Sequence, residues 1–208
     1  MKRIGIMGGT FNPIHNGHLA IAKKAKEQFA LEKVLFMPSG VPYMKDRREV
    51  LPVSVRCEMT ALAITDIPYF ELSLLEAADA ELGKNTYTFE TLQKLRDADP
   101  ETNYYFILGA DSLYAIESWK NPTIIFQNCM ILTAVRTEDS YSQDRLLQQV
   151  QYLRKKYSAS VEILEFEGLD VSSTQIREKM QRGESISGLL PEAVISYILD
   201  NHLYEKDS

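Results

Sequence analysis

The chain has 208 residues, 45% hydrophobic and 25% charged, close to the average of globular proteins and sufficient for a sizeable core. With 23 lysines and arginines against 29 aspartates and glutamates, the net charge of −6 argues against a broad nucleic-acid-binding surface. No apolar stretch is long enough to span a membrane, and the run that ends at Gly8 is too short for a signal peptide.

Short apolar runs bounded by turn-forming residues predict strands, and the periodic segments between them predict helices. The strands are expected at residues 4–7, 33–37, 104–108, 130–135 and 161–166. The helices are expected at residues 17–30, 53–64, 88–97, 142–157, 173–181 and 192–201. Residues 39–48 are predicted to be a mobile loop and residues 76–85 a further connection.

This alternation of strands and helices predicts an α/β fold. We expect a Rossmann-like, mostly parallel sheet with helices on both faces, a C-terminal helical segment, and one domain over residues 1–208. Ligands are expected at the carboxyl ends of the strands. The apolar stripe of the last helix could pack internally, which we favour, or against another subunit in a homo-oligomer; it consists of Val194, Ile195, Ile198 and Leu199.

The two cysteines indicate neither a disulfide framework nor a zinc knot. Cys57 and Cys129 lie far apart in the sequence and lack CxxC spacing. We therefore expect core thiols and a cytoplasmic protein whose partners include neither nucleic acid nor a membrane.

The first predicted strand runs into Gly8 and Gly9 and then towards a helix, a pattern typical of phosphate-binding turns. The turn lacks both the GxGxxG order of dinucleotide-binding dehydrogenases and the Gly-Lys-Ser/Thr of a P-loop. His15 and His18 follow at a spacing that lets both face one pocket. Paired imidazoles suit the charge that develops on a phosphate undergoing displacement.

Two other interpretations of the histidine pair stay open. The pair could ligate zinc, although no HExxH glutamate is present and the third histidine, His202, lies near the C-terminus. It could also be purely structural, since satisfied histidines are common.

The segment GGTFNPIHNGHL, residues 8–19, resembles the GxFxPxHxGH signature of the T/HxGH nucleotidyltransferase superfamily. The resemblance implies that His15 and His18 contact the triphosphate of ATP during attack on the α-phosphorus. It also implies a nucleotide-binding turn formed by Gly8, Gly9, Thr10, Phe11 and Gly17.

A second segment, residues 171–177, resembles the ISSTxIR motif of the same superfamily. Hydroxyls at a helix start can bind phosphate, and the guanidinium of Arg177 offers a planar fork for phosphate oxygens. Alone, the segment could be an ordinary cap, because Ser172 and Gln175 have capping-box spacing. The resemblance implies that Ser173, Thr174 and Ile176 contact ATP and that Arg177 is catalytic.

Lys45 lies where the superfamily carries PPHK, and the resemblance implies that this lysine reaches the phosphates. The residues here are Pro-Tyr-Met-Lys, so the charge is kept while its neighbours differ. A solvated surface lysine is the alternative. Asn12 replaces an aspartate often found in the first motif, which removes a possible charge.

Two further segments point to the acceptor, because they resemble the SYTxxTL and GxD elements of bacterial nicotinate mononucleotide adenylyltransferases. Residues 85–92 carry the first element and residues 107–112 the second. The resemblance implies an acceptor site that contains Thr86, Tyr87, Thr88, Gly109 and Trp119, the indole stacking on the pyridine ring. It places Asp111 and Arg136 near the ribose and adenine of ATP, although each could be a capping acid or a surface charge.

We therefore expect an adenylyltransferase that joins ATP and nicotinate mononucleotide to give deamido-NAD and pyrophosphate, with Mg²⁺ accompanying ATP. Nicotinamide mononucleotide or another phosphate-bearing acceptor is the alternative substrate, since no cation for the nicotinate carboxylate is obvious. A metal-dependent hydrolase and a catalytically silent nucleotide-binding regulator are the alternatives from other classes.

Overall fold

The computed structural model describes residues 1–40, 50–136, 140–166 and 171–205. Its strands are β1 (Arg3–Gly9), β2 (Lys33–Pro38), β3 (Phe70–Leu72), β4 (Asn103–Gly109), β5 (Met130–Arg136) and β6 (Val161–Phe166). Its helices are α1 (Asn16–Gln28), α2 (Val53–Ile64), α3 (Leu75–Glu81), α4 (Thr88–Ala98), α5 (Ala110–Ala115), η2 (Ile116–Ser118), α6 (Pro122–Asn128), α7 (Ser140–Tyr157), α8 (Ser173–Gln181) and α9 (Glu192–Asp200).

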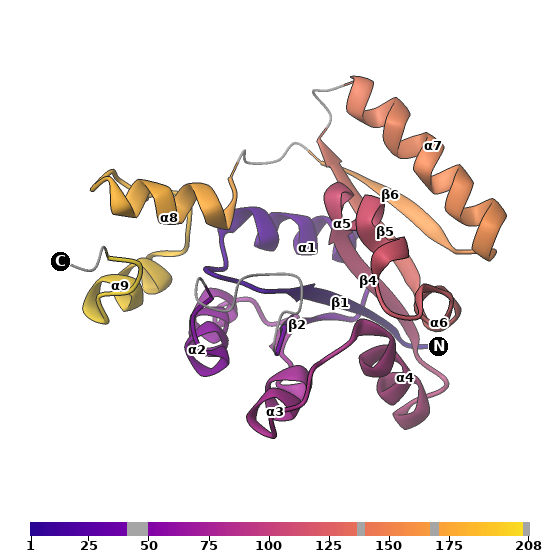
Figure 1. The fold of residues 1–208 in the computed structure, drawn as a ribbon, viewed down its shortest axis with the longest axis horizontal. Helices are drawn as coiled ribbons and strands as arrows, with labels where there is room; N and C mark the ends of the chain where they lie inside the picture. Colours follow the sequence, from indigo (N-terminus) through magenta and orange to yellow (C-terminus); the bar gives the residue numbers. More distant parts are fainter. Residues whose placement is uncertain (41–49, 137–139, 167–170, 206–208) are drawn as a thin grey trace.

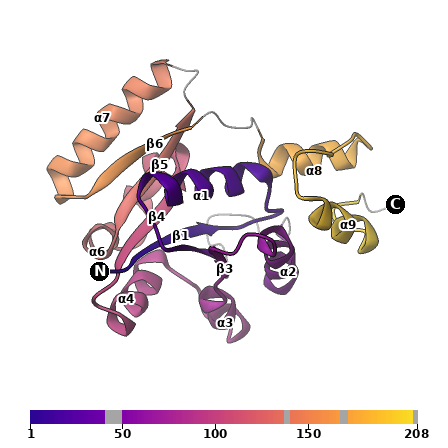
Figure 2. The ribbon, with the colours of Figure 1, turned by 180° about the vertical axis from the view of Figure 1, so that it is seen from behind.

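The strands form one parallel sheet in the order β3-β2-β1-β4-β5-β6; Figure 1 labels every strand but β3, which Figure 2 labels. The order reverses between β1 and β4, which are neighbours in the sheet although about a hundred residues separate them in the chain. In such sheets ligands bind beyond the carboxyl ends of the strands at this switch point. The predicted α/β, Rossmann-like class is confirmed.

Alternate residues of the strands enter two different hydrophobic clusters, as the period of a strand requires. In β4, Tyr105 and Ile107 join the cluster formed with α1, α2, α8 and α9. Tyr104, Phe106 and Leu108 join the cluster formed with α4, α5, α6 and α7. The sheet is therefore buried on both faces, and functional groups have to lie at its edge.

The long predicted elements are confirmed, and the errors concern short ones. Residues 53–64, 161–166 and 173–181 match α2, β6 and α8 in full. The connection expected at residues 76–85 is wrong, because its first part belongs to α3, where alanines favour a helix. The sequence patterns also missed β3, α5, η2 and α6, which have at most seven residues each.

The C-terminal helical segment packs onto the start of α1, and both views show α8 and α9 at that end of the molecule (Figures 1 and 2). The backbone N–H of Asn16 donates to the carbonyl of Leu189 at 2.9 Å. Within the predicted stripe of α9, Val194 and Ile198 are fully buried and Ile195 packs against them, while Leu199 stays exposed. Internal packing therefore accounts for most of the stripe.

Both cysteines are buried free thiols, as expected. In the portion of the chain that the structure describes, none of the helices is long and apolar enough to cross a bilayer.

Candidate active site

The carboxyl end of β1 leads into a tight turn at the switch point of the sheet. A Cβ added at Gly9 would lie 2.7 Å from the ring of Phe11, so this close approach of backbone to ring requires glycine. Phe11 itself has a φ of 49° and is 2% exposed. The turn continues through a cis peptide bond between Asn12 and Pro13 and delivers His15 to the start of α1.

His15 and His18 lie against each other at the first turn of α1. Their rings stack with centroids 3.7 Å apart, and the rings of Phe11 and His18 are nearly perpendicular with centroids 5.0 Å apart. A Cβ at Gly17 would lie 3.0 Å from Nδ1 of His15 and 3.1 Å from Val171, so glycine gives the pair its room. The predicted convergence of the two histidines is confirmed.

The backbone fixes the tautomer of His18. The N–H of His15 donates to Nδ1 of His18 at 3.2 Å, so that nitrogen has to be unprotonated. A neutral His18 ring therefore carries its proton on Nε2 and is a hydrogen-bond donor at that atom. This is the form that favours negative charge on a neighbouring phosphate.

His15 is neutral at pH 7. Its side chain is buried, with 7% of the residue exposed, and burial lowers its pKa to about 4. The two histidines form a capping box at the start of α1, in which each side chain faces the backbone N–H of the other. Nδ1 of His15 forms no hydrogen bond of good geometry with a described residue, so its contact with His18 in this box is a weak one.

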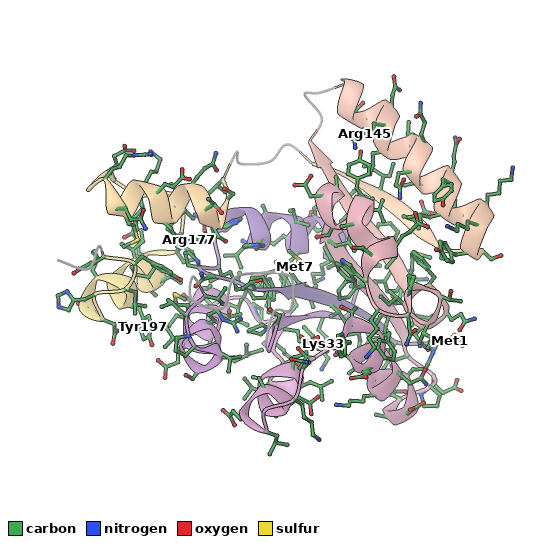
Figure 3. All side chains as sticks on the ribbon, in the orientation of Figure 1. Met1, Met7, Lys33, Arg145, Arg177 and Tyr197 are labelled. Carbon is green, nitrogen blue, oxygen red and sulfur yellow. The ribbon has the colours of Figure 1, made fainter. Side chains whose placement is uncertain are left out.

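The second motif contacts the first directly, although about 160 residues separate them. The hydroxyl of Ser173 donates to the carbonyl of Pro13 at 2.8 Å. Nη1 of Arg177 donates to the carbonyl of Asn12 at 2.8 Å, and Nη2 donates to the hydroxyl of Thr174 at 3.3 Å. In Figure 3, Arg177 lies at the end of the molecule where Figure 1 shows α8 and α9. The predicted capping box of Ser172 is confirmed as well.

The side chain of Asn12 performs an acceptor role that needs no charge. It is 3% exposed, and its Oδ1 accepts hydrogen bonds from the N–H of Leu51 at 3.3 Å and from the hydroxyl of Tyr204 at 2.9 Å. An aspartate could accept the same bonds but would bury a negative charge. The amide therefore ties the turn to two other segments at lower cost.

The predicted acceptor residues lie around the neighbouring strand ends. Thr86 is buried, and Tyr87 and Thr88 lie at the N-terminus of α4. Trp119 is half-buried and meets the ring of Phe106 edge-on at 6.3 Å. Because a Cβ at Gly8 would lie 3.1 Å from that same ring, Phe106 connects the indole to the end of β1.

The remaining predicted residues fall into two groups. Gly109 is the last residue of β4, the strand that neighbours β1 in the sheet. Asp111 lies in the first turn of α5, the helix that follows β4. Arg136 ends β5, but its side chain is outside the described part, as is all of Lys45. Most of the loop expected at residues 39–48 also lies outside the described residues.

A separate cavity of about 280 Å³ lies between α4 and α6, and none of the predicted site residues lines it. Within the described ranges, no group of three His, Cys, Asp or Glu side chains is placed to hold a metal ion. The zinc interpretation of the histidine pair therefore gains no support from these residues.

Comparison with known proteins shows the family of the chain. A family profile described as cytidylyltransferase-like matches residues 6–179. A protein of Lachnoclostridium phytofermentans named "Probable nicotinate-nucleotide adenylyltransferase" is 42% identical over 206 residues, which cover 98% of this chain and 100% of that protein. This chain belongs to the nicotinate-nucleotide adenylyltransferase family.

Further relatives extend the comparison over the whole length of the enzyme. A protein of the same name from Clostridium botulinum strain Eklund 17B is 38% identical, with 100% of both chains covered. The structure of Plasmodium falciparum nicotinic acid mononucleotide adenylyltransferase complexed with NaAD shares the fold, with a TM-score of 0.79 at 19% identity and 98% of both chains covered.

The enzyme also contains a buried arginine that the sequence patterns missed. Arg56, 1% exposed, donates to four carbonyl oxygens: Leu51 at 2.9 Å, Thr10 at 2.7 Å, Ser39 at 2.7 Å and Gly40 at 2.9 Å. Burial lowers the pKa of its guanidinium. It thereby joins the turn after β1, the end of β2 and the start of α2. The burial of Arg56 could have been predicted from its position, because it shares one face of α2 with the buried Met59, Thr60 and Ala63.

Glu76 performs a similar task from α3. Its Oε1 accepts a hydrogen bond from the hydroxyl of Thr91 at 3.0 Å. Burial raises its pKa, while hydrogen bonds from Thr91, the backbone of Gly40 and the side chain of Thr86 act in the opposite direction. This carboxylate therefore links the end of β2 to the predicted acceptor segment. The sequence patterns missed it because residues 76–85 were assigned to a connection.

Proposed function

We propose that this enzyme transfers the adenylyl group of ATP to the phosphate of nicotinate mononucleotide, forming deamido-NAD and pyrophosphate in cytoplasmic NAD biosynthesis. The observation that carries the proposal is the stacked pair of His15 and His18 at the switch point of the sheet, in a turn whose Asn12 carbonyl accepts a hydrogen bond from Arg177. The names of the relatives support the choice of nicotinate mononucleotide as acceptor.

The chemistry is a single in-line displacement. A phosphate oxygen of the mononucleotide forms a bond to the α-phosphorus, and the bond from that phosphorus to the bridging oxygen of the β-phosphate breaks. Pyrophosphate leaves with the electron pair. Because the nucleophile is already an anion, no general base and no covalent enzyme intermediate are needed, and positioning and charge stabilisation carry the catalysis.

Each part of the site has a role in this step. The Nε2–H of His18 donates to the triphosphate. The neutral ring of His15 stacks on the His18 ring and holds it in position. Arg177 exchanges its present carbonyl partner for phosphate oxygens, which its planar fork suits. Gly8 and Gly9 let the backbone approach the nucleotide. Mg²⁺ accompanying ATP would supply further charge stabilisation of the triphosphate beside His18 and Arg177.

Thr10, Phe11, Gly17, Asp111, Arg136, Ser173, Thr174 and Ile176 remain assigned to ATP binding in this proposal. Thr86, Tyr87, Thr88, Gly109 and Trp119 remain assigned to the acceptor. Lys45 is proposed as a further phosphate contact.

The test is the rate of pyrophosphate release by wild type and His18→Ala with ATP. We expect the variant to lose roughly 100-fold or more in kcat, as when a transition-state donor is removed, with little change in KM for nicotinate mononucleotide. His202→Ala, at an exposed histidine, is the matched control and should keep the wild-type rate. A near-normal rate for His18→Ala would contradict the proposal.

A panel of acceptors tests the substrate. Nicotinate mononucleotide, nicotinamide mononucleotide, phosphopantetheine and glycerol phosphate are compared by kcat/KM. Preference for either of the last two, or nucleotide binding without pyrophosphate release, would overturn the assignment.

A further inference from the structure

A cation lies next to the predicted acceptor site. Lys120 directly follows Trp119 in the chain, and its ammonium lies 4.1 Å from the centroid of the Tyr87 ring and 6.0 Å from that of Phe89. Lys120 is thus adjacent to one acceptor residue in sequence and to another in space. The proximity of Lys120 to Tyr87 was not visible from sequence patterns, because more than 30 residues separate them in the chain.

The charge of Lys120 is not neutralised by another side chain of the described part. Lys120 takes part in no ion pair there. The nearest acid in sequence, Glu117, accepts hydrogen bonds from Lys156 at 2.7 Å and Tyr157 at 2.9 Å. The Tyr87 ring restrains the ammonium without cancelling its charge, since a cation–π contact leaves the outer side of the cation exposed.

The two pyridine mononucleotides differ in one group, a carboxylate in nicotinate and a carboxamide in nicotinamide. The side chain of Thr86 is buried and offers at most a neutral hydroxyl donor. A full positive charge distinguishes the acid from the amide more strongly than a neutral donor does.

We propose that Lys120 is a specificity-determining residue, whose ammonium beside Tyr87 attracts the carboxylate of a pyridine mononucleotide stacked on Trp119. This proposal rests on the proposed function. Lys120 favours the acid over the amide and takes no part in phosphoryl transfer.

The test compares wild type with Lys120→Gln, using nicotinate and nicotinamide mononucleotide separately. We expect kcat/KM for the acid to fall about 5- to 20-fold, the range for a partly exposed charge-assisted contact, and kcat/KM for the amide to change less than about 2-fold. Lys120→Arg should keep the preference for the acid. Raising the salt concentration should weaken that preference in wild type and not in Lys120→Gln.

Lys94→Gln is the matched control. It removes the same charge from α4, where Lys94 pairs with Asp79, so the ratio of acid to amide should stay at the wild-type value. A wild type that uses neither mononucleotide overturns the proposed function. A wild type that uses nicotinate mononucleotide, with an unchanged ratio or an equal loss for both substrates in Lys120→Gln, overturns the role of Lys120 alone.

Discussion

Burial of the His15 ring makes the stability of the folded protein depend on pH. Its folded pKa of about 4 lies below the ordinary value of 6.5 because the ring is buried. The unfolded chain therefore binds more protons than the folded chain between these values. The stability that follows is fully present above pH 6.5 and is lost as the pH falls towards 4.

We expect acidification from pH 7 to pH 4 to cost about 3 kcal/mol of unfolding free energy through this residue, since each pKa unit corresponds to 1.36 kcal/mol. Urea unfolding of His15→Gln at several pH values measures it, because glutamine does not titrate. The variant should show a flatter pH dependence by about that amount, whereas His202→Gln, at an exposed site, should keep the wild-type slope. Parallel slopes for wild type and His15→Gln would contradict the buried, neutral histidine.

The sequence predicted that His15 and His18 converge, and it did not predict the hydrogen bonds that connect the two motifs. The spacing of His15 and His18 is visible in the chain, whereas the choice of tautomer depends on a backbone N–H that only the folded turn brings to Nδ1. Arg56 was missed because periodicity arguments expect apolar side chains on a buried helix face. Its burial depends on four carbonyl oxygens, of which those of Thr10, Ser39 and Gly40 lie far from Arg56 in the sequence and enter no local pattern.

At the scale of elements, the segment after α9 is hydrogen-bonded to the turn that carries the two histidines. Tyr204 follows the last helix, and burial raises the pKa of its hydroxyl, which stays protonated and donates to Asn12. The same asparagine supplies the carbonyl that positions Arg177. The C-terminal turn therefore contributes to a site formed by residues near the N-terminus.

Tyr204→Phe should lower the unfolding free energy by about 1 kcal/mol, the usual net value of one hydrogen bond, and lower kcat/KM for ATP several-fold. Tyr197→Phe is the control, since its hydroxyl binds Glu58 on the surface, 2.6 Å away. It should leave kcat/KM unchanged. Equal effects of both substitutions on kcat/KM would show that the turn does not act through Asn12.

Predictability of the elements followed their length. Helices and strands with a sustained period, such as α2 and β6, were predicted to the residue. β3 has three residues and is held by pairing with β2, a tertiary interaction that leaves little local pattern. α5, η2 and α6 follow one another within about 20 residues, so none of them is long enough to show a helical period.

At the scale of the molecule, we propose that the chain is a single domain. The hydrophobic cluster on the α1 face includes Phe11 and Ile14 together with Val194 and Ile198, so the two ends of the chain share one core. A shared core favours all-or-none unfolding.

Thermal unfolding followed by far-UV circular dichroism and by the fluorescence of Trp119 should give coincident transitions. ATP at 100 times its dissociation constant should raise the unfolding free energy by about 2.7 kcal/mol and shift both transitions together. A separate, ATP-insensitive transition would show that α8 and α9 unfold independently and would contradict the single domain.

The contact of Ser173 with Pro13 and of Arg177 with Asn12 has a consequence during synthesis of the protein. Ribosomes make the turn that carries the histidine pair early, but Ser173 and Arg177, which bind its carbonyls, are added about 160 residues later. A nascent or prematurely terminated chain contains the turn without the group that completes it. The hydrogen bonds that fasten this turn to α8 can therefore form only late in translation.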